Sequence, residues 1–211
     1  LNVPSNARHR TTFHAILVRL LLSPNGTDKL GISFEEFMRP ILDTMTQLGA
    51  LDSTQLRSEA ARMPLIGVFR DLRGVCMSMH NRRTFSLLFD LLEPQHFPLM
   101  SRVADLWHDQ PDVIISLLRF LGEFCHNKAN RVNFDQSSPN GILLFRVTSD
   151  AVCAYGRRAL ASPTPTAGDI YKLKYKGMSL ALSVLNSALG GNYVCFGVFA
   201  LYNDPALENA L

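Results

Sequence analysis

The feature that most constrains this chain is that its apolar residues return every three or four positions along nearly its whole length. Between Leu65 and Met79 they occupy positions 65, 68, 69, 72, 75, 76 and 79, which lie on one face of an α-helix. Only "YKLKYK" (171–176) alternates as a strand would. It runs into a helical pattern without a turn signal, so we assign it to a helix and predict an all-α protein.

Capping and turn signals divide the pattern into helices. We expect helices at about 13–21, 33–48, 54–79, 84–92, 97–107, 111–126, 138–160, 169–189 and 193–202. Ser33 and Glu36 have the spacing of a capping box. Pro40 and Pro64 are predicted to bend their helices, because the apolar spacing resumes after each. Asp169 is expected to cap the helix that follows it.

Successive helices joined by short loops are typical of both a compact bundle and a stacked solenoid. The bent helices favour the solenoid, so we predict a HEAT-like fold of stacked antiparallel helix pairs over residues 1–211. The expected units are 10–50, 53–92, 95–128, 137–190 and a partial unit, 192–211. The chain has no initiator Met and stops within a helical pattern, which leads us to expect a segment of a longer protein.

Composition narrows the class of partner. Hydrophobic residues make up 47% of the chain and charged residues 18%, which is enough for a core and too little charge for disorder. The net charge of +3 is far from the dense basic patch of a nucleic-acid binder, so no direct nucleic-acid partner is expected. The longest apolar stretch, "MSLALSVLNSALGG", is shorter than the ~20 residues of a membrane span, so no membrane insertion is expected.

The turn "SSPNG" places two hydroxyls and a glycine at a helix start, where they could hold an anion. A P-loop needs GxxxxGK[ST] after a strand, and this turn has neither the lysine nor the strand. We instead predict that Ser138 caps a helix whose first residue is Pro139. Ser137 lacks a nucleophile elbow. His96 and His108, near helix ends, are expected to face solvent. No catalytic residue is therefore predicted, and no cofactor.

Two Cys and two His residues raise the possibility of a zinc site. Cys76 and His80 lie four positions apart on one helix, and Cys125 and His126 are adjacent on another. Adjacent residues point in different directions on a helix, and both cysteines fall on apolar faces. We predict buried thiols, surface histidines and no metal. A zinc-dependent helical enzyme stays an alternative that stoichiometric zinc in the purified protein would revive.

A polar strip opposite an apolar face can bind other proteins. One such strip holds Gly67, Arg70, Asp71, Gly74 and Ser78, and a matching strip on another helix holds Asp112, Ser116, Arg119, Glu123 and His126 or Asn127. The candidate protein-binding residues are Arg70, Asp71, Arg73, Arg119, Glu123, Lys172 and Lys176. The alternative is an ordinary solvated face with intrahelical Arg–Glu pairs worth ~0.2–0.5 kcal/mol each.

Four strings in this chain resemble a known family. They are "RDLRGV" (70–75), "LWHDQP" (106–111), "FDQSSPNGILLFR" (134–146) and "NYVCFGVFALYNDPALENAL" (192–211). In order and spacing they are similar to the exportins, Ran-dependent transport receptors of the importin-β (karyopherin) superfamily. The similarity covers the chain from about Arg10 onward and matches a part beyond the middle of such a receptor.

The resemblance implies a HEAT solenoid that binds Ran-GTP and protein cargo together. Such a receptor shuttles between nucleus and cytoplasm through the pore, where it contacts phenylalanine-glycine (FG) nucleoporins, and it is not itself an enzyme. It releases cargo when GTP is hydrolysed on Ran. A Ran-independent helical scaffold or adaptor is the leading alternative.

Overall fold

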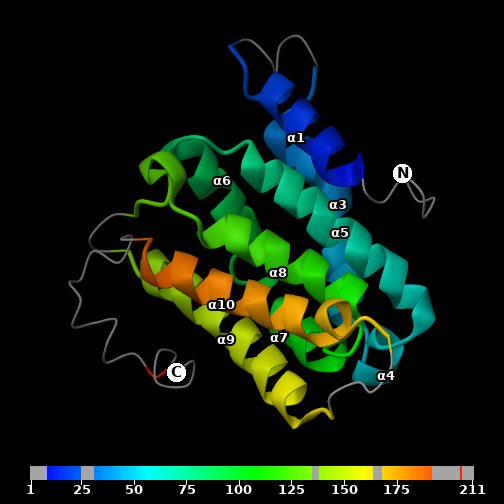
Figure 1. Ribbon diagram of the computed structural model, residues 1–211. Helices are drawn as coiled ribbons and strands as arrows, with labels where there is room; N and C mark the ends of the chain where they lie inside the picture. The colour runs from blue at the N-terminus through cyan, green and yellow to red at the C-terminus, as the bar shows by residue number, and fades with distance from the viewer. Residues whose placement is uncertain (1–8, 25–30, 135–137, 164–167, 192–204, 206–211) are drawn as a thin grey trace.

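The computed structural model describes residues 9–24, 31–134, 138–163, 168–191 and 205 (Figure 1). The longer helices are α1 (Arg10–Leu21), α3 (Phe34–Ala50), α5 (Glu59–Met77), α6 (Arg82–Leu92), α7 (Phe97–Leu106), α8 (Pro111–Cys125), α9 (Asn140–Ala161) and α10 (Lys176–Leu189). A short α4 (Ser53–Leu56) precedes α5, and a π-helical turn (Tyr171–Tyr175) leads into α10. No strand occurs within these ranges. The helix expected at 193–202 lies outside them.

The helices form two layers (Figure 1). In one layer α1, α5, α8 and α10 lie side by side in chain order, each packed against the one before it. In the other layer α3 packs on α5, and α7 packs on α9, which also contacts α10. Each later helix of a layer thus packs beside an earlier one and lengthens the stack. The predicted all-α helical-repeat fold is confirmed. The boundaries given above for the repeat units stay a prediction.

Local signals set where the helices begin. The Ser33 hydroxyl accepts a hydrogen bond from the Glu36 backbone N–H at 3.1 Å, and the Glu36 carboxylate accepts one from the Ser33 N–H at 2.7 Å. The predicted capping box is therefore confirmed. The helix expected over 54–79 is broken at Arg57 and Ser58, because the Asp52 carboxylate caps the separate turn of α4. Pro40 and Pro64 both lie inside helices that continue past them.

The start of α9 differs from its prediction by one position. Pro139 is the cap and Asn140 the first helical residue, while the Ser138 hydroxyl accepts from the Asn140 N–H at 3.2 Å. At the next helix start, the Asp169 carboxylate accepts from the Lys172 N–H at 3.1 Å, as predicted. Both helix starts use a side-chain oxygen to satisfy a backbone N–H that the helix itself leaves unpaired.

A phenylalanine cluster joins the two layers. Phe124 on α8 lies 5.4 Å from Phe85 and 6.2 Å from Phe89 of α6, measured between ring centroids. Phe97 at the start of α7 lies 5.5 Å from Phe89. These edge and stacked contacts add to the burial of the rings, which is the main source of stability in a stacked repeat. The cluster fixes α8, and with it any surface that α8 presents.

The predictions for Cys76, Cys125, His80 and His126 are confirmed, the prediction for His96 is wrong, and His108 is only partly exposed. Cys76 and Cys125 are buried, and burial raises the pKa of each thiol to about 12, while His80 and His126 are exposed. Cys153 is only partly buried. His96 was expected to face solvent, but its residue is 5% exposed. In the described part of the chain, no group of three or more Cys, His, Asp or Glu is placed to hold a metal.

None of the described helices is both long enough and apolar enough to cross a lipid bilayer.

An arginine groove as candidate functional site

The small, polar strip of α5 is covered by α1. A Cβ atom added to Gly74 would lie 2.3 Å from the Thr11 carbonyl oxygen, so only glycine permits this approach. The Ser78 hydroxyl donates to the Ala15 carbonyl at 2.7 Å. Gly74 and Ser78 therefore form the seat of α1. This differs from the predicted partner-binding wall, and the reason is that close packing of two helices also selects small residues.

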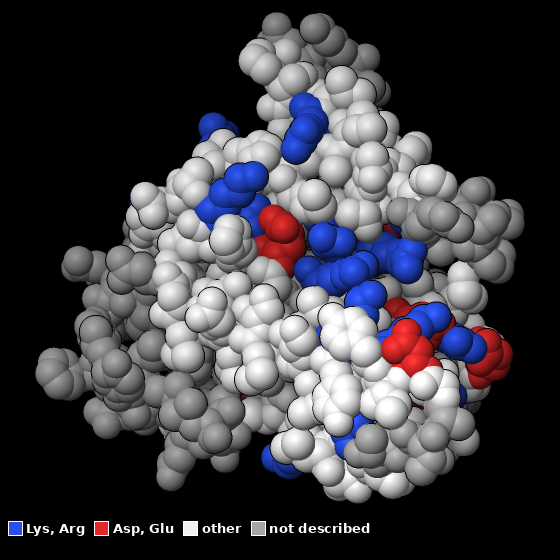
Figure 2. All heavy atoms as spheres, in the orientation of Figure 1, with Lys and Arg blue, Asp and Glu red and all other residues white. Residues whose placement is uncertain are grey.

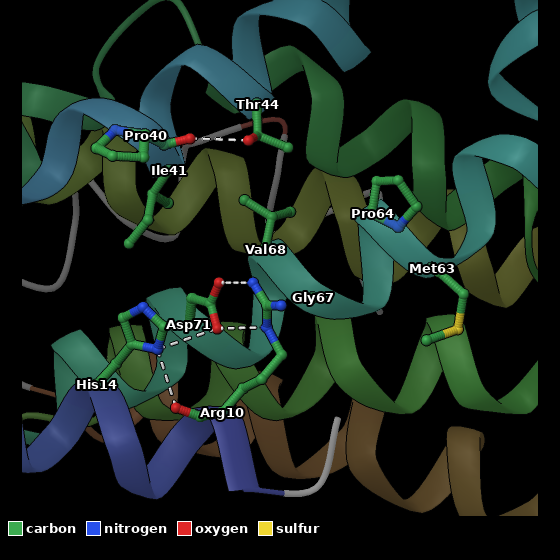
Figure 3. Close-up of a pocket in the computed structure, with 10 residues that line it drawn as sticks. All are labelled: Arg10, His14, Pro40, Ile41, Thr44, Met63, Pro64, Gly67, Val68 and Asp71. Carbon is green, nitrogen blue, oxygen red and sulfur yellow. Dashed lines mark hydrogen bonds and ion pairs between the residues drawn. The ribbon is translucent and has the colours of Figure 1, made fainter. Parts of the chain in front are cut away.

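Asp71, one of the predicted binding residues, belongs to the same seat (Figure 3). Its residue is 3% exposed, and its carboxylate accepts from the Nε of Arg10 at 2.7 Å and from the Nη2 of the same side chain. The Nδ1 of His14 lies 3.1 Å from the carboxylate. Gly67 leaves room for the Arg10 guanidinium, which would lie 3.1 Å from a Cβ there. Asp71 thus holds α1 in place.

The ion pair forms one wall of a pocket between α1, α3 and α5 with a volume of about 570 Å³ (Figure 3). The pocket is lined by Arg10, His14, Pro40, Ile41, Thr44, Met63, Pro64, Gly67, Val68 and Asp71. Its charged groups are already matched to one another, since Arg10 and His14 both face the Asp71 carboxylate. The remaining lining is largely apolar, so this pocket offers no free charge to a ligand.

A second hollow has the opposite character. It measures about 320 Å³ between α1, α5 and α8, and its lining comprises Thr11, Thr12, Arg70, Arg73, Met77, Ser116 and Arg119. We call it the arginine groove. Figure 2 shows Lys and Arg atoms gathered at the centre of this face, with carboxylates at the edges of the patch. The fold therefore brings together three of the predicted binding residues: Arg70 and Arg73 from α5 and Arg119 from α8.

The three guanidinium groups repel one another. Burial lowers the pKa of Arg70, and the charge of Arg119 lowers it further. The pKa of Arg73 is lowered by the same two causes in the same order, burial first and then Arg119. Guanidinium groups carry a positive charge at neutral pH, because the ordinary pKa of arginine lies far above 7. The groove thus keeps like charges close together at a cost in free energy.

The two carboxylates that could neutralise the groove are engaged elsewhere. Asp112 accepts from the Nη2 of Arg62 at 2.7 Å, and Glu123 accepts from the Nη2 of Arg131 at 3.1 Å. Burial and the charge of Arg119 each lower the pKa of Arg70 by more than Asp112 raises it. For Arg73, burial and Arg119 likewise outweigh the rise in pKa that Glu123 causes. The groove therefore stays positively charged although acidic residues stand beside it.

Arg131, which the sequence did not single out, holds this arrangement together. Its residue is 1% exposed, and it donates to the carbonyls of Cys76 at 2.7 Å, Met79 at 2.8 Å and His126 at 3.1 Å. These carbonyls lie at or near the C-terminal ends of α5 and α8, where the helix leaves them unpaired and the helix dipole is negative. Arg131 thus joins the two helices that carry the groove and holds Glu123.

Hydrogen bonding inside the groove is incomplete. The Nε of Arg73 is buried and has no hydrogen-bond partner. The Nε of Arg70 reaches the Ser116 hydroxyl only at 3.5 Å, the outer limit of a hydrogen bond. Buried donors are rarely left unpaired in folded proteins. Among the described residues, no ion pair involves Arg73 or Arg119, so the groove holds unmatched positive charge beside a buried donor without a partner.

The other predicted residues do not line the groove. Lys172 is in the π-helical turn and exposed, Lys176 begins α10 and is partly exposed, and neither lines the arginine groove. Glu123 is bound to Arg131. The sequence could group residues on one helix face, but it held no signal for which faces of different helices would meet.

Comparisons with known proteins give this surface a context. The chain is 41% identical over 208 residues to Exportin-7-B of Xenopus laevis, which covers 98% of the chain and 19% of that relative. It is 39% identical over 207 residues to Ran-binding protein 17 of Homo sapiens, and 35% identical over 208 residues to Exportin-7 of Dictyostelium discoideum. The resemblance predicted from the sequence is confirmed, and the chain spans about a fifth of the length of these relatives. No family model and no solved structure matches it.

Proposed function

We propose that this chain is a segment of a karyopherin-type nuclear export receptor that binds Ran-GTP and protein cargo together. The observation that carries the proposal is the identity of 35–41%, over nearly the whole chain, to proteins named exportin-7 and Ran-binding protein 17. The helical-repeat fold supports it. The proposed receptor shuttles between nucleus and cytoplasm, contacts FG nucleoporins in the pore and has no catalytic role of its own.

The proposed mechanism follows from stacked repeats. Each helix pair contacts only its neighbours, so small rotations at each interface add up to a large change in curvature. Ran-GTP and cargo that both favour one curvature must then strengthen each other's binding, because coupling between two sites is reciprocal. Cargo would be released when GTP hydrolysis on Ran removes one of the two ligands. In this mechanism the segment contributes part of the flexible helical stack, together with the arginine groove on its surface.

Pulldown with nucleotide-loaded Ran tests the proposal. The intact protein that contains this chain is incubated with Ran loaded with GTP or with GDP, in the presence and absence of nuclear extract. Preferential recovery of the GTP form, increased by cargo, is expected. Equal recovery of both forms, or none, would support the alternative of a Ran-independent scaffold or adaptor.

Charge reversal tests whether the arginine groove takes part. Arg70→Glu, Arg73→Glu and Arg119→Glu together, in the intact protein, are expected to weaken the capture of Ran-GTP or of cargo. Arg83 on α6 is exposed and does not line the groove, so Arg83→Glu is the control for a change of charge. Unchanged capture with the triple variant would place the contact surface elsewhere.

A further inference from the structure

We propose that the arginine groove is a receptor for an acidic protein segment that carries carboxylates on alternate residues. This rests on the proposed function in that the segment would belong to a protein cargo. The groove itself argues for the ligand's chemistry. It combines three guanidinium groups, an unpaired buried Nε on Arg73, and neighbouring carboxylates that other arginines already hold.

An anion would supply the counter-charge and the hydrogen-bond acceptors that the groove lacks. A carboxylate accepts two hydrogen bonds from one guanidinium in a planar fork, and it is favoured where cations repel one another. The Nε of Arg73 that the protein leaves without a partner is closed to solvent, so a bound carboxylate pairs it only after the Arg73 side chain turns toward the groove. Between Arg73 and Arg119 it would offset the repulsion that lowers the pKa of Arg73. The charges of the groove are therefore more nearly balanced with an acidic ligand bound than without one.

The spacing of the arginines indicates an extended peptide. Arg70 and Arg73 lie one helical turn apart on α5, and Arg119 lies on the adjacent helix α8. Packed helices have axes about 8–10 Å apart, and every second residue of an extended chain lies about 7 Å further on. Carboxylates on alternate residues can then reach guanidinium groups on both helices. Thr11 and Thr12 supply hydroxyls along the α1 side of the groove.

The lining argues against nucleic acid as the ligand. Single-stranded nucleic acids stack their bases on aromatic side chains beside the basic groups that bind the backbone. The residues that line the arginine groove include Met77 and three hydroxyl side chains but no aromatic ring. The net charge of the whole chain is only +3. The positive charge is local, which suits a short acidic segment better than a long polyanion.

Fluorescence anisotropy tests the proposal in the intact protein. The probe is a short fluorescein-labelled peptide in which Glu alternates with Ser, and the control peptide has Gln in place of Glu. Arg73→Gln is expected to weaken the binding of the Glu peptide by at least about tenfold, and the control Arg83→Gln by less than twofold. Binding should also fall as NaCl rises from about 0.1 M to about 0.5 M.

A second variant guards against misfolding. If Arg73→Gln lowers the melting temperature, Arg119→Gln replaces it, because Arg119 is exposed. Binding of the Glu peptide that neither variant weakens more than Arg83→Gln would overturn the proposal. So would equal binding of the Gln peptide, or competition by inorganic phosphate or by an oligothymidylate as strong as by the Glu peptide.

The assay is independent of Ran. Loss of Glu-peptide binding in Arg73→Gln, combined with equal capture of both Ran forms, would support the acidic-ligand groove and oppose the proposed export function. GTP-dependent capture of Ran without any Glu-peptide binding would support the export function and overturn this inference.

Discussion

Arg10 and Asp71, 61 residues apart, form an ion pair that fastens α1 to α5 at the head of the stack. Both oxygens of the Asp71 carboxylate accept from Arg10, and the carboxylate is almost completely buried. A single charge–charge contact with two hydrogen bonds resists sliding of one helix along the other. The pair thus sets the register of α1, whose Thr11 and Thr12 form one side of the arginine groove.

Breaking this pair should destabilise the fold. In Asp71→Asn the mostly buried guanidinium of Arg10 loses an ionised hydrogen-bond partner, and we expect a loss of about 1.5–3 kcal/mol in the free energy of unfolding, the usual contribution of hydrogen bonds to charged groups. Urea unfolding followed by circular dichroism measures it. Asp90 is exposed on α6, so Asp90→Asn should change stability by less than about 0.5 kcal/mol. Similar losses in the two variants would show that the pair does not hold α1.

Two glycines should respond in opposite ways to alanine. Gly74→Ala places a Cβ 2.3 Å from the Thr11 carbonyl oxygen, so α1 must shift, and we expect a loss of about 2 kcal/mol. Gly156, inside α9, has nothing within 4 Å of an added Cβ. Gly156→Ala should therefore stabilise the protein by about 0.5–1 kcal/mol, the difference in helix propensity. Thermal unfolding of both variants checks the signs, and a stabilising Gly74→Ala would contradict the described packing.

Gly74 also shows why the sequence predicted the helices better than the surface. Apolar spacing and the Ser33–Glu36 capping box depend on neighbours in the chain, and they located α3 closely and the apolar face of α5, though not its first residue. A strip of small and polar residues has two physical uses, since it suits both a wet surface and the close approach of another helix. Only the position of α1 decides between them, and that position depends on the contact between Arg10 and Asp71.

For the same reason, the sequence predicted the arginines of the candidate site but not that they would meet in one groove. Arg70, Arg73 and Arg119 were selected because each lies on the polar side of an amphipathic helix, which the spacing reveals. That they meet in one groove depends on the packing of α5 against α8. Arg131 could not be selected, because it lies in a connecting segment whose hydrogen bonds run to main-chain carbonyls of Cys76 and Met79, and carbonyls leave no trace in the sequence.

His96 should make stability fall in mild acid. Burial lowers the pKa of His96 below its usual 6.5, so the folded state favours the neutral ring. The group's contribution is therefore present above pH 6.5 and is lost as the pH falls through the lowered pKa of the folded state. We expect a lower urea midpoint at pH 5.5 than at pH 7.5. The decrease should be smaller in His96→Gln, and an equal decrease in this variant would contradict the assignment to His96.

Arg119 should show a conflict between stability and binding. Arg119→Gln removes a charge that is, after burial, the second cause of the lowered pKa of both Arg70 and Arg73, so unfolding should require up to about 0.5 kcal/mol more free energy, or about 1–2 °C in melting temperature. The same variant should bind the Glu peptide more weakly. Arg158→Gln is a matched control, because Arg158 donates to Asp105 at 2.7 Å and its loss should lower the melting temperature slightly. A melting temperature that falls more in Arg119→Gln than in Arg158→Gln would mean that Arg119 stabilises the fold. The groove would then not be a binding surface that is maintained at the expense of stability.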